Sequence, residues 1–495
     1  MTSEQNDMPR RSLIGRFSQW LFSWRTVRRG LVALACLATL IAAFYTEENW
    51  RGKRAWEKCK QELEAQGEVL DWAAYIPQPV PDEQNIFKAP KMQEWFVGRG
   101  ATELSRKLTN SATGSVGSSN VIQDIDAAKA YLNWSDQITN DFNTIREALK
   151  RPYARMDGDY DKPFEIPIPN FVAMRMVAQT LAQRTHCHLL LEQPENALRD
   201  LTLLHDLRFL LEAKPSGKPM SLVAAMINVA VTGLYANTIA DGMRMRAWHE
   251  PQLAAIQKQL EEVNLPPLVR LALQSEPAAV CRSIETLGFG RLMQAVSNPR
   301  HKPSLWERIW NWIKGLDMNI YALAPRGWLY QNMAVYVRLT VKYCDGFEND
   351  GQEIVPHQVK QSQSDILAAL SHRTPFNVLA RVGVPNFSRA FQTTVHNQTL
   401  VNETFIVCAL ERYRLAHGQY PETLDALVPQ FADTLPHEVI GSQPLHYRRT
   451  DNGGFVLYSV GWNETDDGGQ IVRKKDGTVD TYSNEGDWVW SPSAN

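Results

Sequence analysis

An uncharged apolar run near the start of the chain limits what this sequence can fold into more than any other feature. The run GLVALACLATLIAAFY extends from Gly30 to Tyr45. As a helix rising about 1.5 Å per residue, it is roughly 24 Å long, somewhat shorter than the ~30 Å hydrocarbon core of a bilayer. Trp24 and Tyr45 flank it and suit the two membrane interfaces. The sequence therefore predicts a transmembrane anchor over residues 30–46.

A cleaved signal peptide is the alternative interpretation of this run. Its best small-x-small cleavage pattern, Ala33-Leu-Ala35, lies in the middle of the run, and further apolar residues follow it. A cleavage site is expected at the end of an apolar region, so this position favours an uncleaved anchor.

The basic residues around the anchor predict its orientation. Their numbers on the two sides are nearly equal, but Arg25, Arg28 and Arg29 directly precede the run, whereas acidic residues come first on the other side. The positive-inside rule places the side with the nearer arginines in the cytoplasm. We therefore expect a short cytoplasmic leader, residues 1–29, and a single-pass protein with the bulk of the chain exported.

Length and composition are those of an ordinary folded protein. The chain has 495 residues, of which 44% are hydrophobic and 21% are charged, and this length suits about two to four domains. The formal net charge of -2 gives no basic excess, so we expect no nucleic-acid partner. The six cysteines show no CxxC or metal-ligand spacing, and buried free thiols are favoured over a disulfide framework.

The exported part begins with a juxtamembrane region of mixed character, residues 47–165. A helix is predicted over Trp50–Gln66 as a stalk next to the membrane. The small, polar, low-complexity segment Thr109–Asn120 reads as a flexible loop. Its glycine and serine spacing matches neither a phosphate-binding loop nor a nucleophile elbow, so it receives no catalytic role.

Residues 166–391 are almost wholly helical in pattern. The apolar segment Met220–Met243 is interrupted by polar residues, which favours a buried central helix over a second membrane span. Ser304–Leu316 (SLWERIWNWIKGL) places tryptophans on one helical face. That face packs in the core or rests on a membrane or partner, and both interpretations stay open.

Residues 392–495 have the pattern of a small α+β domain. A long helix is expected to end near His417-Gly418, where glycine takes the left-handed conformation that closes helices. Two strand-like segments, Leu445–Thr450 and Phe455–Val460, flank Asp-Asn-Gly-Gly, a typical hairpin turn. We expect this hairpin to pack on the long helix through three of its side chains: Tyr447, Val456 and Tyr458.

The order of these tail elements resembles the soluble domain of the major pseudopilins of type II secretion systems. The resemblance covers about residues 392–490 and rests on ALERYRLAHGQYPETLDALV, the hairpin and the following Asp-rich loop. The segment Pro325-Arg-Gly-Trp-Leu-Tyr-Gln-Asn332 is similar to a motif of uncharacterised bacterial membrane-anchored helical proteins that carry the same tail. The expected fold class is mainly α, with a transmembrane helix, a helical central domain and a pseudopilin-like α+β C-terminal domain.

Calcium is the one cofactor that the resemblance implies. In major pseudopilins the matching loop carries acidic residues that bind this ion. Carried over to this chain, the ligands are Asn463, Asp466, Asp467 and Asp487. Calcium prefers six to eight oxygen ligands, which Asp, Asn and backbone carbonyls supply. The alternative is an ordinary polar turn, since Asp and Gly are also common turn residues.

The sequence departs from the pseudopilins at its N-terminus. It has no prepilin peptidase site of the Gly-Phe-x-Leu-x-Glu type, and the whole central region separates the anchor from the tail. Assembly into a fibre by the usual helix packing is therefore not expected. A protein-docking or stabilising role is the better interpretation of the tail.

Motifs that would indicate catalysis are absent from the sequence. It contains no HExxH, no GxxxxGK[ST], no GxSxG and no paired Cys motif. His186-Cys187-His188 has metal-ligand residue types, but neighbouring positions on a helix point to different faces, so we predict that it binds no metal.

The sequence thus favours a non-catalytic protein of the bacterial envelope, held in the inner membrane with its bulk in the periplasm. It would contact other envelope proteins, as part of a secretion or pilus assembly. Two alternatives stay open. One is a hydrolase with a site of scattered Asp, Glu and His in the helical domain, and the other is a helical receptor for an apolar or peptide ligand near residues 304–316.

Overall fold

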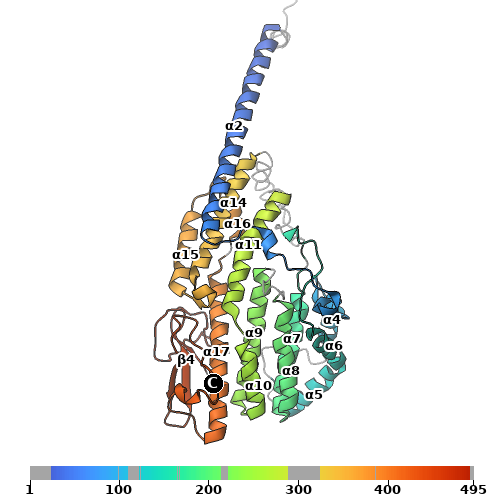
Figure 1. Cartoon of the computed structure of the whole chain (residues 1–495), viewed down its shortest axis with the longest axis vertical. Coiled ribbons are helices and arrows are strands. Elements are labelled where there is room, and N and C mark those ends of the chain that lie inside the picture. Colours follow the sequence, from blue (N-terminus) through green and yellow to red (C-terminus); the bar gives the residue numbers. More distant parts are fainter. Residues whose placement is uncertain are drawn as a thin grey trace, which may run out of the picture.

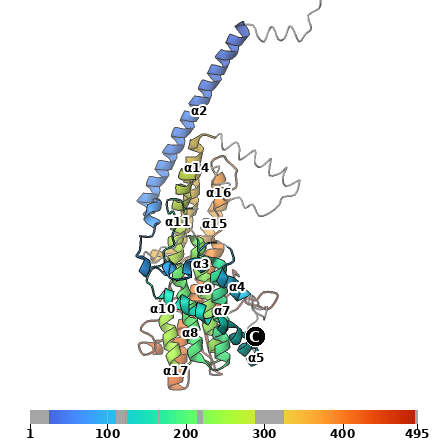
Figure 2. The same cartoon turned by 90° about the vertical axis from the view of Figure 1, so that its right-hand side faces the viewer.

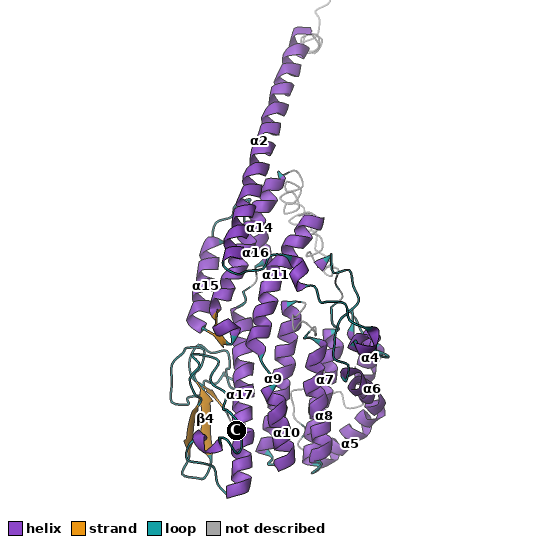
Figure 3. Ribbon diagram, viewed as in Figure 1, coloured by secondary structure: helices purple, strands orange, loops and turns teal. Residues whose placement is uncertain are grey.

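The computed structural model describes residues 24–98, 100–109, 122, 124–163, 166, 168–212, 221–287, 324–384 and 386–490. Over these residues the protein is mainly helical, and its larger sheet lies near the C-terminal end (Figure 3). Apart from Thr109, the predicted flexible loop lies outside the described residues, and so does the predicted tryptophan-rich helix at 304–316.

The N-terminal helix α2 (Trp24–Ala65) projects from one end of the molecule as a single helix of 42 residues (Figures 1 and 2). It is one of two described helices that are long and apolar enough to cross a membrane, and none of its apolar window is buried. The other, α9 (Leu222–Arg244), has 67% of its window buried. The predicted stalk is therefore not a separate helix, because it continues the apolar helix without a break.

The body of the molecule consists of helices that lie roughly side by side (Figure 1). In chain order they are α3 (Met92–Phe96), α4 (Glu103–Thr109), α5 (Ile125–Ser135), α6 (Thr139–Leu149), α7 (Phe171–Leu190), α8 (Pro194–Asp206), α9, α10 (Glu250–Glu261), α11 (Leu265–Leu287), α14 (Arg326–Val341), α15 (Pro356–Ala369), α16 (Val378–Gly383) and α17 (Ser388–His417). Helix α9 is the central helix that the sequence predicted, since it packs against α7, α8, α11 and α17.

The second half of α2 packs lengthwise against α14, and the two helices run parallel. They meet at two glycines. A Cβ built on Gly52 would lie 2.0 Å from the carbonyl oxygen of Gly327, and one built on Gly327 would lie 1.8 Å from that of Glu48. No side chain fits at either position, so the two backbones are in direct contact. Further along the pair, Cys59 Sγ lies 3.7 Å from the Ala334 carbonyl oxygen.

The C-terminal end of the protein combines α17 with an antiparallel sheet of strand order β3-β4-β5. The strands are β3 (His446–Arg449), β4 (Phe455–Ser459) and β5 (Trp488–Val489). Helix α17 ends at His417, and Gly418 closes it with a φ of 80° while its N–H donates to the Arg414 carbonyl at 2.7 Å. The predicted helix end and hairpin are confirmed. We call residues 388–490 the C-terminal module.

The prediction for the faces of the hairpin is only partly right. Tyr447 pairs with Leu457, so these two side chains share a face, and Leu457 is fully buried in the main core. Side chains alternate along a strand, so Val456 and Tyr458 lie on the other face. There the Tyr458 hydroxyl donates to Asp466 at 3.1 Å. The register therefore excludes the predicted packing of Val456 and Tyr458 on the long helix.

A second, smaller hairpin interrupts the region predicted to be wholly helical. Strands β1 (Phe347–Glu348) and β2 (Glu353–Ile354) pair antiparallel between α14 and α15. Each strand has two residues, which is too short to show the alternation that identifies a strand in a sequence.

Helix α17 packs against both the helical body and the C-terminal sheet. It packs against α9, α10 and α11, and against β4. One buried core accordingly extends from Ile86 to Trp490. Each large side chain buried there contributes about 1.5–3 kcal/mol. An isolated module would expose the α17 surface that α9 and α10 cover, so experiments on it require the full chain.

Candidate functional site

The loop that the sequence singled out for calcium lies against the sheet of the C-terminal module. Asp467 Oδ2 accepts hydrogen bonds from Asn463 Nδ2 at 2.8 Å and from the Gly486 N–H at 3.0 Å. The two carboxylate oxygens of Asp487 accept from the N–H groups of Asp467 and Gly469, at 3.2 and 2.6 Å. The structure thus brings Asn463, Asp467 and Asp487 into one network that closes the loop.

Asp466 lies apart from that network. Its Oδ1 accepts from the Tyr458 hydroxyl and from the Gly468 N–H, at 3.1 and 2.9 Å, and His446 Nδ1 lies 3.6 Å from its Oδ2. The hydrogen bond from Gly468 lowers the pKa of Asp466 below its ordinary value. This exposed carboxylate therefore ties the loop to the outer face of the sheet.

Within the described residues, no group of three or more His, Cys, Asp or Glu is arranged to hold a metal ion. Calcium takes six to eight oxygens, whereas here the oxygens of Asp487 and one of Asp467 accept N–H groups. In this arrangement the four predicted ligands do not form a calcium cage. Calcium binding by Asn463, Asp466, Asp467 and Asp487 stays a prediction of the sequence.

Glu438 is a buried acid beside this loop that the sequence analysis missed. Its side chain is 4% exposed, and Oε1 accepts the Val460 N–H at 3.1 Å. Burial, helped by the nearby charges of Asp487 and Asp466, raises its pKa to about 7. Its segment, PHEVIG, has no periodicity that could have indicated burial.

One stripe of α17 places polar groups against the rest of the module. His396 packs edge-on against Trp488 with ring centroids 5.2 Å apart, and burial lowers its pKa to about 4. Thr399 and Glu403 follow on the same face, at 2% and 3% exposure. Among the described residues, His396 Nδ1, Thr399 Oγ1 and Glu403 Oε1 have no hydrogen-bond partner. Burial and the neighbouring Glu438 raise the pKa of Glu403 well above its ordinary value.

The side chains of His186, Cys187 and His188 are separated on α7, as helical geometry predicts. His186 Nε2 lies 2.7 Å from the Ile122 carbonyl oxygen, and His188 Nδ1 lies 2.9 Å from Gln193 Oε1. Cys187 is fully buried in a separate apolar cluster. Each residue therefore has its own packing role in the helical body.

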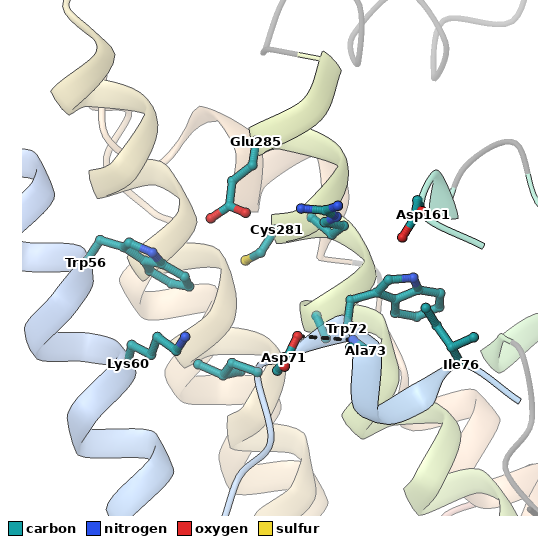
Figure 4. A pocket seen from close by; sticks show the side chains of 12 residues that line it. Trp56, Lys60, Asp71, Trp72, Ala73, Ile76, Asp161, Cys281 and Glu285 are labelled. Carbon is teal, nitrogen blue, oxygen red and sulfur yellow. Dashed lines mark hydrogen bonds between the residues drawn. The ribbon is translucent and has the colours of Figure 1, made fainter. Parts of the chain in front are cut away.

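A cavity of about 270 Å³ lies near the junction of α2 with the body (Figure 4). Its lining comes from four parts of the chain. They are the second half of α2 with Trp56 and Lys60, the segment 70–76, the loop residue Asp161, and α11 with Cys281, Arg282 and Glu285. This volume lies just below the range of about 300–1,000 Å³ that is usual for small-molecule sites.

The side chains of this cavity do not form a recognisable catalytic group. Figure 4 shows Glu285 and Asp161 on opposite sides of α11, and Asp71 accepts the Ala73 N–H at 3.1 Å as a helix cap. Burial raises the pKa of the Cys281 thiol well above its ordinary value, which keeps the sulfur protonated and weakly nucleophilic. The carboxylates do not converge on one point, as a hydrolase would require.

Comparison with known proteins adds no relative. No protein-family model matches the chain, and neither a curated protein nor a solved structure matches it. The structure itself defines a mainly helical protein with an N-terminal apolar helix that could anchor it in a membrane, and with a small C-terminal sheet.

Proposed function

We propose that this chain is a bacterial inner-membrane protein that holds a pseudopilin-like module in the periplasm for contact with other envelope proteins. Its role is non-catalytic, as part of a secretion or pilus assembly. The observation that carries the proposal is the placement of the module. The sheet and the end of α17 lie at the end of the molecule farthest from the exposed apolar half of α2 (Figure 1).

The contact between α2 and α14 supports this role. The apolar helix enters the body without a linker and meets α14 backbone to backbone at Gly52 and Gly327. Such a joint transmits the direction of the anchor to the body. A protein that presents a binding module at a fixed distance from a membrane benefits from that rigidity, whereas a diffusing enzyme has no need of it.

Site-specific photo-crosslinking in native membranes tests the proposal. A photoreactive amino acid in place of Val479 or Tyr482, both exposed on the module, is expected to capture components of a secretion or pilus assembly. The matched control replaces Val172, which is exposed on α7 of the helical body. Crosslinks from the control position alone, or none from the module, would contradict the proposed role of the module.

The orientation in the membrane has its own test. Arg25, Arg28 and Arg29 precede the apolar run, so export of the remainder predicts an active alkaline phosphatase when that enzyme is fused after Asn495 in a bacterial host. A fluorescent cytoplasmic reporter fused at the same position is expected to stay dark. The reverse pattern would place the body in the cytoplasm.

A further inference from the structure

The junction of α2 and α14 fixes how high the body stands above the bilayer. Gly327 N–H donates to Asn49 Oδ1 at 2.8 Å, so the first turn of α14 lies level with Asn49 of α2. Asn49 is four residues beyond Tyr45, which places this level about 6 Å past the end of the apolar run. The headgroup layer is about 5–7 Å thick on each side of the hydrocarbon core. The start of α14 thus lies within that layer.

Arg326 is the residue of α14 closest to the bilayer, because α14 runs parallel to α2 and away from the membrane. Gly327 contacts Glu48, and further along Arg338 Nη2 donates to Glu62 at 2.7 Å. Arg326 precedes these contacts and its side chain is exposed. Its guanidinium is therefore held at the level of the lipid phosphates.

The next turns of α2 add an aromatic ring, roughly 8 Å past the end of the apolar run, and a second arginine that reaches back to this ring. Trp50 is 61% exposed, and Arg54 stacks on it with its guanidinium carbon 5.3 Å from the ring centroid. Helical side chains tilt toward the N-terminus, which here is the membrane side. The stacking therefore directs the Arg54 charge toward the bilayer. Tryptophan is also the residue that suits the headgroup region best.

We infer that Trp50, Arg54 and Arg326 form a membrane-contact rim that binds the headgroups of anionic phospholipids in the bilayer spanned by α2. The inference rests on the proposed function, since it requires α2 to be the anchor. The rim holds the body against the membrane surface and fixes its tilt, which the helix α2 alone leaves free to vary.

The test uses the full chain in nanodiscs of phosphatidylcholine and phosphatidylglycerol. Electron paramagnetic resonance of spin-labelled lipids measures the association of phosphatidylglycerol relative to phosphatidylcholine. A basic residue near a surface of this kind changes anionic-lipid affinity about fivefold. The double variant Arg54→Gln/Arg326→Gln is expected to lower the relative association by about this factor for each arginine. Both side chains are exposed, so the fold is retained.

Lys474→Gln/Lys475→Gln is the matched control, because it removes the same charge from exposed positions of the distal module. It is expected to leave the lipid preference unchanged. An equal loss in both double variants, or no loss in either, overturns the inference.

A nitroxide at position 40 distinguishes failure of the rim from failure of the anchor. Accessibility to oxygen there shows that α2 lies in the bilayer, and an unchanged lipid preference of Arg54→Gln/Arg326→Gln then refutes the rim alone. A label at position 40 that is accessible only to water-soluble reagents refutes the anchor, and the rim with it.

Discussion

The two ends of the described molecule are held together by different kinds of contact. At the junction of α2 and α14, glycine backbones touch, and the buried Glu48 is paired with Arg51 and with the indole N–H of Trp328. In the C-terminal module, acidic groups are buried beneath the sheet, and Glu403 Oε1 has no partner among the described residues. The junction therefore combines a steric contact of two backbones with a buried carboxylate that has partners, whereas the module buries a carboxyl oxygen that has none.

Because of this difference, the two ends of the molecule are expected to respond to different changes. The glycine contact depends on the size of two residues and does not itself involve a group that titrates. Buried carboxyl groups change their charge with pH, and their desolvation makes that change costly. The glycine contact at the α2 end is thus suited to fixed geometry, and the C-terminal module is the part whose stability solution conditions adjust.

The largest effect is expected from filling the glycine contact. In Gly327→Val a side chain would have to occupy space where Glu48 and Asn49 backbone atoms lie within 2.8 Å of the new Cβ. Because backbone cannot move aside as a side chain can, we expect a loss of about 3 kcal/mol in unfolding free energy. The two helices then separate, and Cys59 between them becomes open to maleimide. Alkylation of Cys59, followed by mass spectrometry, measures this.

The matched control for that variant is Gly30→Val on the same helix. A Cβ at Gly30 meets nothing within 4 Å, so its valine is accommodated and Cys59 stays protected. Equal alkylation of Cys59 in both variants would show that the glycine contact does not hold the junction together.

The next effect is a pH dependence confined to the module. Burial raises the pKa of Glu438 from its ordinary 4.5 to about 7, so the folded state binds this proton more tightly than the unfolded state does. The resulting stabilisation is fully present below pH 4.5 and is lost as the pH rises to 7. We expect a loss of about 2 kcal/mol, less than the full shift implies, because solvent screens part of it.

Hydrogen exchange of the β4 amides at several pH values measures this loss. Relative to Glu438→Gln, which cannot ionise, the natural chain is expected to lose protection between pH 4.5 and 7. Buried His396, whose pKa lies at about 4, stabilises the module as the pH rises, and it contributes equally in both chains. The amides of α14 provide the internal comparison, since they belong to the steric junction. An equal fall in the protection of the α14 amides would show that the pH dependence is not confined to the C-terminal module.

A smaller effect is expected from the loop that covers these acids. Asp487 is 4% exposed and accepts two backbone N–H groups, so Asp487→Asn leaves one of them without its acceptor. The expected cost is about 1.5 kcal/mol. Exchange of the amides over 461–470 should accelerate. Asp466→Asn is the control, because Asp466 is exposed and water can replace its bonds. If hydrogen exchange accelerates equally in both variants, Asp487 does not hold the loop closed.

Local signals in the sequence predicted the apolar N-terminal helix and the hairpin well. The uncharged run marks α2, and His417-Gly418 marks the end of α17 because glycine takes the left-handed conformation there. The contact between Gly52 and Gly327 was not predictable, because it joins positions far apart in the chain. Each glycine alone looks like a weak point in a helix.

The candidate site was predicted only in part, for a similar reason. Asp467 and Asp487 are brought together as the Asp-rich loop indicated, but Asp466 turns to the sheet. The buried acids Glu403 and Glu438 were missed. A glutamate reads as a surface residue in a sequence, and its burial depends on tertiary packing that no local pattern records.

The smallest effect concerns calcium, the ion that the resemblance to pseudopilins implies for this loop. Binding to the folded state alone raises stability by about 1.4 kcal/mol when the ion is at ten times its dissociation constant. We expect calcium to raise the unfolding midpoint of the full chain, and Asp466→Ala/Asp467→Ala to abolish the rise. To bind, the ion must displace the N–H groups that now occupy the carboxylates, which keeps the gain small.

The control for the calcium test is Asp157→Ala/Asp159→Ala, in an acidic loop outside the module. It should keep the full response to calcium, because its carboxylates are not among the predicted ligands. If calcium leaves the unfolding midpoint of the natural chain unchanged, the calcium prediction is wrong. The hydrogen bonds of Asp467 and Asp487 alone then hold the loop closed. If calcium still raises the unfolding midpoint of Asp466→Ala/Asp467→Ala, the ion binds to other oxygens. The distal end would still respond to solution conditions, but through a different set of residues.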